Sequence, residues 1–126
     1  MKLLFALVVL ALMALPSATP AQYVMDIGNL IAGLQVGDFS GDLENFDRAQ
    51  VVYVTRLSRI AGVRVSGARL DRTIASRQRV LSYLRAIIGQ SRVAMKALAV
   101  HGEELEDVIF LTTTNDGSAM LYVDDR

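Results

Sequence analysis

Residues 70–88, LDRTIASRQRVLSYLRAII, are the stretch that decides the fold. Apolar side chains recur there at spacings of four, seven, three and four residues. These spacings stack the side chains along one side of an α-helix. The stripe consists of Leu70, Ile74, Leu81, Leu84 and Ile88. The pattern predicts one amphipathic helix that lies on an apolar core.

Arg77 interrupts this apolar stripe. Successive helical residues turn by about 100°, so Arg77 falls near the middle of the stripe, between Ile74 and Leu81. One interpretation is a buried aliphatic stem whose guanidinium reaches the helix edge or a carboxylate. The other interpretation is a functional arginine that faces an anion.

Basic residues concentrate in the middle of the chain. Residues 48–96 hold eleven basic residues and one acidic residue, whereas residues 22–47 hold five acidic residues and no basic one. Acidic ends folded over a basic middle would cancel these charges. The alternative is a basic helix face that binds an anionic partner. The candidate side chains are Arg69, Arg72, Arg77, Arg79 and Arg85.

The first 21 residues have the three parts of a secretory signal peptide. Lys2 supplies the positive charge, residues 3–15 are apolar, and residues 16–21 are mostly small. The apolar run is too short for a membrane span, which needs about 20 residues. Thr19 and Ala21 suit a cleavage site, so we expect a mature chain from Gln22 without a transmembrane helix. The bacterial periplasm or the exterior is the expected location.

Two segments have the composition of β-strands and a third follows a turn. Residues 48–58 are rich in β-branched and aromatic side chains, and so are residues 107–114. Asn115, Asp116 and Gly117 form a strong turn signal before a third strand over residues 118–124. The strands over residues 107–114 and 118–124 are therefore predicted to form a hairpin.

The resulting fold is a small α+β domain over residues 48–126, with the order β-α-α-β-β. Gly89 ends the first helix, and Ser91 caps a second helix over residues 92–101, antiparallel to the first. We expect a three-stranded sheet, antiparallel throughout, with the helical pair packed on one face. Before it, residues 22–47 form an apolar arm, with a short helix or irregular structure, and then an acidic loop.

The predicted sheet poses a question of coverage. Its strands contain continuous apolar runs, and two helices cover only one face. A soluble protein rarely exposes a large apolar patch. The arm, a second copy of the chain or another protein is therefore expected to cover the reverse face.

Motifs for catalysis and for cofactor binding are missing. His101 is the only histidine, cysteine is absent, and no nucleophile elbow, P-loop or dinucleotide motif occurs. A calcium site in residues 37–47 is a minor alternative, because the acids there lack the spacing of an EF-hand loop. The sequence therefore favours a non-catalytic domain without a cofactor or metal, which binds a protein partner or itself. Binding of an anionic surface, such as a membrane surface, is the alternative, and an exported chain makes nucleic acid an improbable ligand.

Overall fold

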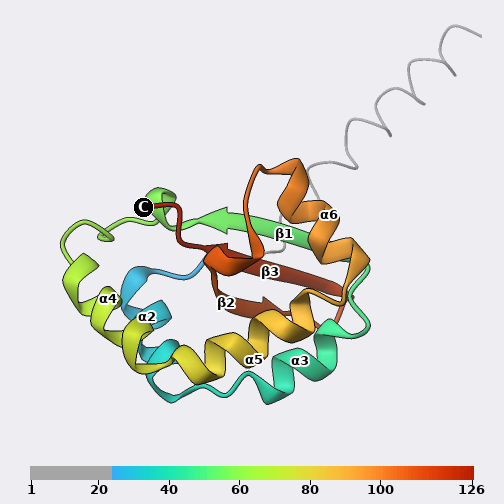
Figure 1. Ribbon diagram of the computed structural model, residues 1–126, viewed down its shortest axis with the longest axis horizontal. Coiled ribbons are helices and arrows are strands. Elements are labelled where there is room, and N and C mark those ends of the chain that lie inside the picture. The colour runs from blue at the N-terminus through green and yellow to red at the C-terminus, as the bar shows by residue number, and fades with distance from the viewer. Residues whose placement is uncertain (1–23) are drawn as a thin grey trace, which may run out of the picture.

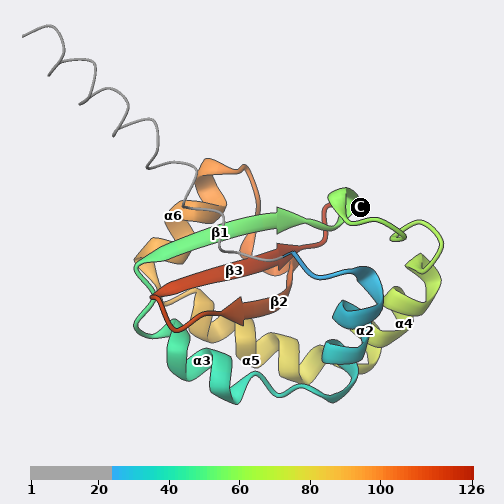
Figure 2. The ribbon, with the colours of Figure 1, turned by 180° about the vertical axis from the view of Figure 1, so that it is seen from behind.

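A computed structural model describes residues 24–126, and the predicted signal peptide lies outside this range. The described chain is an α+β fold with a three-stranded mixed sheet (Figures 1 and 2). The strands are β1 (Val51–Arg56), β2 (Val108–Thr113) and β3 (Ser118–Val123). The helices are α2 (Ile27–Val36), α3 (Ser40–Phe46), α4 (Gly67–Ser76), α5 (Gln78–Ile88) and α6 (Arg92–Val100). Single 3-10 turns follow β1 (η2, Leu57–Arg59) and precede β2 (η3, Leu105–Asp107).

The prediction of a sheet that is antiparallel throughout is wrong, because one of its two strand pairs is parallel. The order is β1-β3-β2, with β1 parallel to β3 and β2 antiparallel to β3. The predicted hairpin is confirmed, and Gly117 has a φ of 88° in its turn. The second strand of the hairpin, β3, lies between β1 and β2 and runs in the same direction as β1. As a result, β1 and β2 are both edge strands.

The predicted long helix is two helices, α4 and α5, which break at Arg77. Arg77 has φ −115° and ψ 21°, outside the helical range. The break lets α4 pack on α2, while α5 packs on β2 (Figure 1). Most of the predicted apolar stripe is nevertheless buried: Leu70, Leu81, Leu84 and Ile88 are inaccessible to solvent, and Ile74 is partly buried.

The second predicted helix, α6, begins after Ser91, whose side chain accepts a hydrogen bond from the Ala94 N–H at 3.1 Å. It packs on β1, on the same face of the sheet as α5 (Figure 1). Ala94 and Leu98 are buried, whereas Val93 is 41% exposed. Helices α5 and α6 therefore lie on one face of the sheet, α5 over β2 and α6 over β1.

The segment predicted as an acidic loop contains a helix, α3, over Ser40–Phe46. Phe39 takes a left-handed conformation with a φ of 62°, and the Asp38 carboxylate accepts a hydrogen bond from the Ser40 N–H at 3.0 Å. Leu43 and Phe46 then point into the core. This burial outweighs the turn-forming composition of the segment.

The arm covers part of the reverse face of the sheet. Its helix α2 begins at Asp26, whose carboxylate accepts a hydrogen bond from the Asn29 N–H at 2.8 Å. Phe39 meets the ring of Phe110 edge-on at a centroid distance of 5.0 Å. The Tyr122 hydroxyl accepts a hydrogen bond from the Met25 N–H at 3.0 Å. Arm and sheet therefore share one apolar core.

The β1 part of the reverse face is less covered. Tyr53 and Thr55 alternate with the residues that face α6 and are half-buried, and Val51 is 48% exposed. Of the three expected ways to cover the reverse face, the arm therefore accounts for the β2–β3 side, whereas the described part of the arm leaves β1 partly exposed.

Candidate functional site

The five arginines predicted as candidates divide into two groups. Arg69, Arg72 and Arg79 are exposed on α4 and α5. Within residues 24–126, none of these three side chains forms an ion pair. We call Arg69, Arg72 and Arg79 the basic surface.

Arg77 belongs to the second group, because its side chain turns into the protein. Its Nη2 donates a hydrogen bond to the Gly37 carbonyl oxygen at 2.6 Å. Its Nε is buried, and no acceptor from the described residues reaches it. Arg77 therefore ties the end of α2 to the break between α4 and α5.

Arg77 also lies near the carboxylate of Asp38. The pKa of Asp38 is below its ordinary value, chiefly because the backbone and side chain of Ser40 donate hydrogen bonds to the carboxylate. The charge of Arg77 is a smaller cause. The guanidinium of Arg77 therefore lies between the Gly37 carbonyl and the charge of Asp38.

Arg85 is the second inward arginine. Its Nε donates a hydrogen bond to the Val108 carbonyl oxygen at 2.8 Å, where the register of β2 is irregular. Burial lowers the pKa of Arg85, while the nearby charges of Asp107 and Glu106 oppose this effect. Arg85 thus holds the start of β2 through its Nε.

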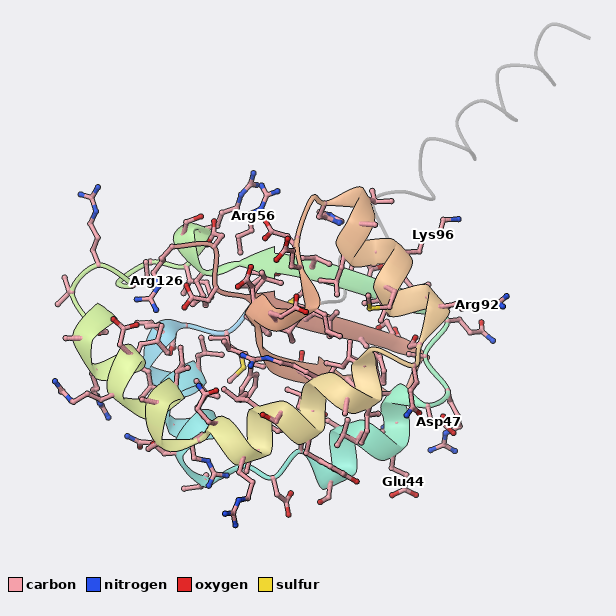
Figure 3. The ribbon with its side chains drawn as sticks, in the orientation of Figure 1. Glu44, Asp47, Arg56, Arg92, Lys96 and Arg126 are labelled. Carbon is pink, nitrogen blue, oxygen red and sulfur yellow. The ribbon has the colours of Figure 1, made fainter. Side chains whose placement is uncertain are left out.

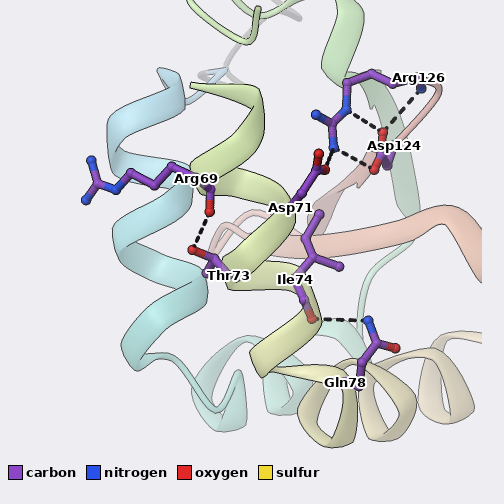
Figure 4. Close-up of polar contacts among 7 residues, drawn as sticks. All are labelled: Arg69, Asp71, Thr73, Ile74, Gln78, Asp124 and Arg126. Carbon is purple, nitrogen blue, oxygen red and sulfur yellow. Dashed lines mark hydrogen bonds and ion pairs between the residues drawn. The ribbon is translucent and has the colours of Figure 1, made fainter. Parts of the chain in front are cut away.

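The one acidic residue of the basic middle segment, Asp71, has a partner at the end of the described chain. The guanidinium of Arg126 contacts the Asp71 carboxylate at 2.6 Å and that of Asp124 at 2.8 Å, whereas Arg69 points away from this cluster (Figure 4). The hydrogen bond with Asp124 raises the pKa of Arg126. This cluster joins α4 to the segment after β3, and it sets one guanidinium between two carboxylates.

A second candidate site, which the sequence did not predict, is the outer edge of β1. The Thr114 N–H donates to the Ser118 carbonyl oxygen at 3.0 Å, which makes these two residues a hydrogen-bonded pair of the hairpin. Backbone groups on an antiparallel strand point to alternate sides. Ser118, Met120 and Tyr122 therefore direct their backbone groups to β2. The backbone groups that β3 directs to β1 are those of Ala119, Leu121 and Val123.

The same alternation fixes which groups of β1 are free. Since β1 runs parallel to β3 in register, its odd-numbered residues, 51, 53 and 55, direct their backbone groups to β3. The hydrogen bond from the Val51 N–H to the Gly117 carbonyl agrees with this phase. Val52, Val54 and Arg56 therefore direct their N–H and C=O groups outward. No residue of the described chain forms a hydrogen bond with these outward groups.

The opposite edge of the sheet, at β2, is closed. The Asp42 carboxylate on α3 accepts hydrogen bonds from the Thr113 N–H at 3.2 Å and from the Thr113 hydroxyl at 2.8 Å. Arg85 occupies the Val108 carbonyl at the other end of the strand. The two edges therefore differ: β2 is mostly buried, with side chains bound to backbone groups at both of its ends, whereas no residue of the described chain pairs with the outward groups of β1.

Side chains beside the β1 edge leave room for a ligand strand. A hollow of about 300 Å³ lies along the second half of β1 and is lined by Val24, Val54, Thr55, Arg56, Arg59 and His101. Residues 51–55 carry no charge, and proline is absent from the strand. Lysine, proline and bulges are the usual devices that block an edge strand, and β1 has none of them.

Arg56 is the charged end of this edge, and it is already held in place. Its Nε contacts the Glu103 carboxylate at 2.5 Å, and its Nη2 donates to the His101 carbonyl oxygen at 2.7 Å. Figure 3 shows Arg56 on the β1 side of the molecule, while Arg92 and Lys96 extend from α6. The charge at the end of β1 therefore has an internal partner.

His101, the histidine predicted at a helix end, lies directly after α6. The His101 ring Nδ1 contacts the Ala97 carbonyl oxygen of its own helix at 2.8 Å. Between residues 24 and 126, no group of three histidine or acidic side chains is arranged to hold a metal ion. The helices in that range include none long and apolar enough to cross a membrane.

Comparison of the chain with protein-family models, with curated proteins and with solved structures found no match. The functional argument therefore depends on the geometry of the open edge and of the basic surface.

Proposed function

We propose that this protein binds another polypeptide by strand addition at the outer edge of β1. The observation that carries the proposal is the row of outward N–H and C=O groups on Val52, Val54 and Arg56, which lack partners within the described chain. An extended segment that pairs with this row gains main-chain hydrogen bonds, and its alternate side chains contact the two sides of β1.

The apolar character of β1 supports the same function. Val51 is 48% exposed, and the next four residues are only partly buried although all are aliphatic, aromatic or β-branched. A strand added beside them would cover this surface. We propose further that the binding takes place outside the cytoplasm, because the chain begins with the pattern of a cleaved signal peptide. Amino-terminal sequencing of the exported protein tests this point, with Gln22 as the expected first residue.

Site-specific photo-crosslinking in cells that make the protein tests strand addition. A photoreactive amino acid at Val51, beside the edge, should give a crosslinked product. The substitution Val54→Pro should abolish that product, since it removes an outward N–H while leaving the bonds between β1 and β3 in place. A photoreactive amino acid at Tyr83, which is exposed on α5, is the matched control. Products at position 51 that persist in Val54→Pro, or no product there, would contradict strand addition.

A second candidate function is the binding of an anionic surface through the basic surface. It is favoured by one observation, that Arg69, Arg72 and Arg79 are exposed without ion pairs in the described chain. Retention on anionic vesicles should then fall with added salt and in the double variant Arg72→Ser, Arg79→Ser. The double variant Arg92→Ser, Lys96→Ser on α6 removes the same charge elsewhere and should retain binding. Equal retention of both double variants would contradict this second function.

A further inference from the structure

The outward backbone groups of β1 are spaced so that a second copy of β1 can pair with them in antiparallel orientation. Val52, Val54 and Arg56 each offer one N–H and one C=O, at every second residue. An antiparallel strand pairs with such a row through groups that are also at every second residue. A second copy of β1 presents the same set. The edge is therefore self-complementary, which is what a two-fold symmetric interface requires.

We infer that the strand added at β1 is β1 of a second copy, antiparallel, with the two-fold axis at Val54. This inference rests on the proposed strand addition and names its occupant. The register follows from Gln50, whose N–H is already bonded to the Gly117 carbonyl at 2.8 Å. Pairing is therefore confined to residues 52–56.

An axis at Val54 uses every free group. Val54 of one copy then pairs with Val54 of the other, and each Val52 pairs with Arg56 of the other copy. Each of these residue pairs exchanges two N–H···O bonds. An axis at Tyr53 would instead set Arg56 opposite Gln50 of the other copy. The Gln50 N–H is already bonded to the Gly117 carbonyl, so the backbone carbonyl of Arg56 would lack a donor in both copies.

The side chains agree with this register. Tyr53 lies opposite Thr55 of the second copy, which is an aromatic and β-branched pair of the kind that stabilises sheets. The two Val54 side chains meet at the axis. Each Arg56 lies opposite an uncharged Val52, and its guanidinium is held by Glu103 in its own copy. The pairing thus brings no like charges into opposed positions.

A stripe of apolar side chains on α6 gives independent support. Val93, Ala97 and Val100 follow at helical spacings of four and three residues, and Val93 and Val100 are 41% and 73% exposed. The helix packs on β1, the strand at the proposed interface (Figure 1). Joining two copies at β1 brings the two α6 helices next to each other on one face of a six-stranded sheet. Apolar residues there become part of the interface.

The chain lacks cysteine, so single cysteines report on the register without background. Val54→Cys should form a disulfide-linked dimer under mild oxidation, because paired Cα atoms at the axis lie about 5.5 Å apart. Val52→Cys is the matched control: the two copies of residue 52 are offset by four residues, about 14 Å, which no disulfide spans. Equal linking of both variants, or no linking of Val54→Cys, overturns the register and the inference.

Sedimentation velocity of the purified protein gives the second readout. We expect a dimer for the wild type and a monomer for Val54→Pro, with circular dichroism confirming that the variant is folded. Val54→Lys, which sets two ammonium groups at the axis, should also be a monomer. A monomeric wild type at the highest soluble concentration, or a dimer that survives both substitutions, overturns the inference. If the photo-crosslinked product at Val51 is a different protein and still depends on Val54, strand addition stands and only the second copy is rejected.

Discussion

Arg77 shows how one side chain can break a helix and support the fold around the break. In a continuous helix its guanidinium would lie inside the apolar stripe, where a charge is costly without partners. The break between α4 and α5 lets the group reach the Gly37 carbonyl, 40 residues earlier in the chain. Its buried Nε remains without an acceptor from the described residues, so the arrangement is only partly satisfied.

Replacing Arg77 with methionine should therefore have two opposing effects. The variant loses a hydrogen bond from a charged donor, and it also loses a buried N–H without an acceptor. We expect the free energy of unfolding to fall by about 1–2 kcal/mol, measured by urea denaturation. Arg79→Met on the exposed side of α5 is the control and should change it by less than about 0.5 kcal/mol. A stability gain in Arg77→Met would show that the bond to Gly37 contributes little.

Asp124 makes stability depend on pH at the acid end. The hydrogen bond from Arg126 lowers the pKa of Asp124 below its ordinary value of 3.8. A lowered pKa in the folded state stabilises the fold above the unfolded pKa, and this contribution is lost as pH falls through the folded value. Asp124→Asn should be less stable than the wild type at neutral pH, by about 0.5–1 kcal/mol for such a partly exposed pair. The difference, measured by urea denaturation, should shrink below about pH 4.

At the scale of elements, α2 depends on a glycine that the sequence alone marks as unfavourable. A Cβ built on Gly33 would lie 2.7 Å from the Phe110 ring, so the helix approaches the sheet more closely than any other residue permits. Glycine costs about 1 kcal/mol in a helix interior, and close packing on Phe110 offsets this cost. The arm is thus a short helix that needs the sheet as its support.

Gly33→Ala should consequently destabilise the protein although alanine is the better helix former. The clash with Phe110 is expected to lower the free energy of unfolding by about 1–3 kcal/mol in thermal or urea denaturation. Gly28→Ala in the first turn of α2 is the control, because its nearest neighbour outside the helix backbone is the Asp26 carboxylate at 3.5 Å. That variant should gain about 0.5–1 kcal/mol. The opposite order of the two variants would mean that α2 is not packed against Phe110.

Elements set by local chemistry could be predicted from the sequence, and elements set by distant contacts could not. The Asn115-Asp116-Gly117 turn fixes the hairpin within a few residues. By contrast, α3 forms because Leu43 and Phe46 find the core. The parallel pairing of β1 with β3 joins segments more than sixty residues apart, and no nearby residue encodes it. The open edge was missed for the same reason, because it follows from strand order.

The candidate arginines show the same limit. The sequence predicts a basic helix face, and Arg69, Arg72 and Arg79 are exposed on α4 and α5. The helix phase could not show that Arg85 reaches the Val108 carbonyl, 23 residues later. The contacts of a side chain at the border of an apolar stripe depend on the element that packs against it, and helix phase alone does not identify that element.

At the scale of the whole molecule, the sheet is asymmetric between its two edges. Asp42 of α3 and Arg85 bind backbone groups at the two ends of β2, while no residue of the described chain pairs with the outward groups of β1. Open edges invite pairing with other chains, and proteins that stay monomeric usually block them. If strand addition takes place only at the β1 edge, as we propose, the assembly is expected to stop at two copies.

Amide hydrogen exchange followed by NMR resolves this asymmetry residue by residue. Tyr53 and Thr55 donate to β3, so their amides should exchange slowly at every protein concentration. Val52, Val54 and Arg56 point outward, so their amides should exchange rapidly in dilute protein and slowly once pairing at β1 is populated. In Val54→Lys the amides of Val52 and Arg56 should stay rapid at all concentrations, while those of Tyr53 and Thr55 stay slow. If the amides of residues 52–56 all exchanged at the same rate, β1 would be exchanging as one unit. That result would contradict a strand whose odd-numbered amides are bonded to β3 and whose even-numbered amides point outward.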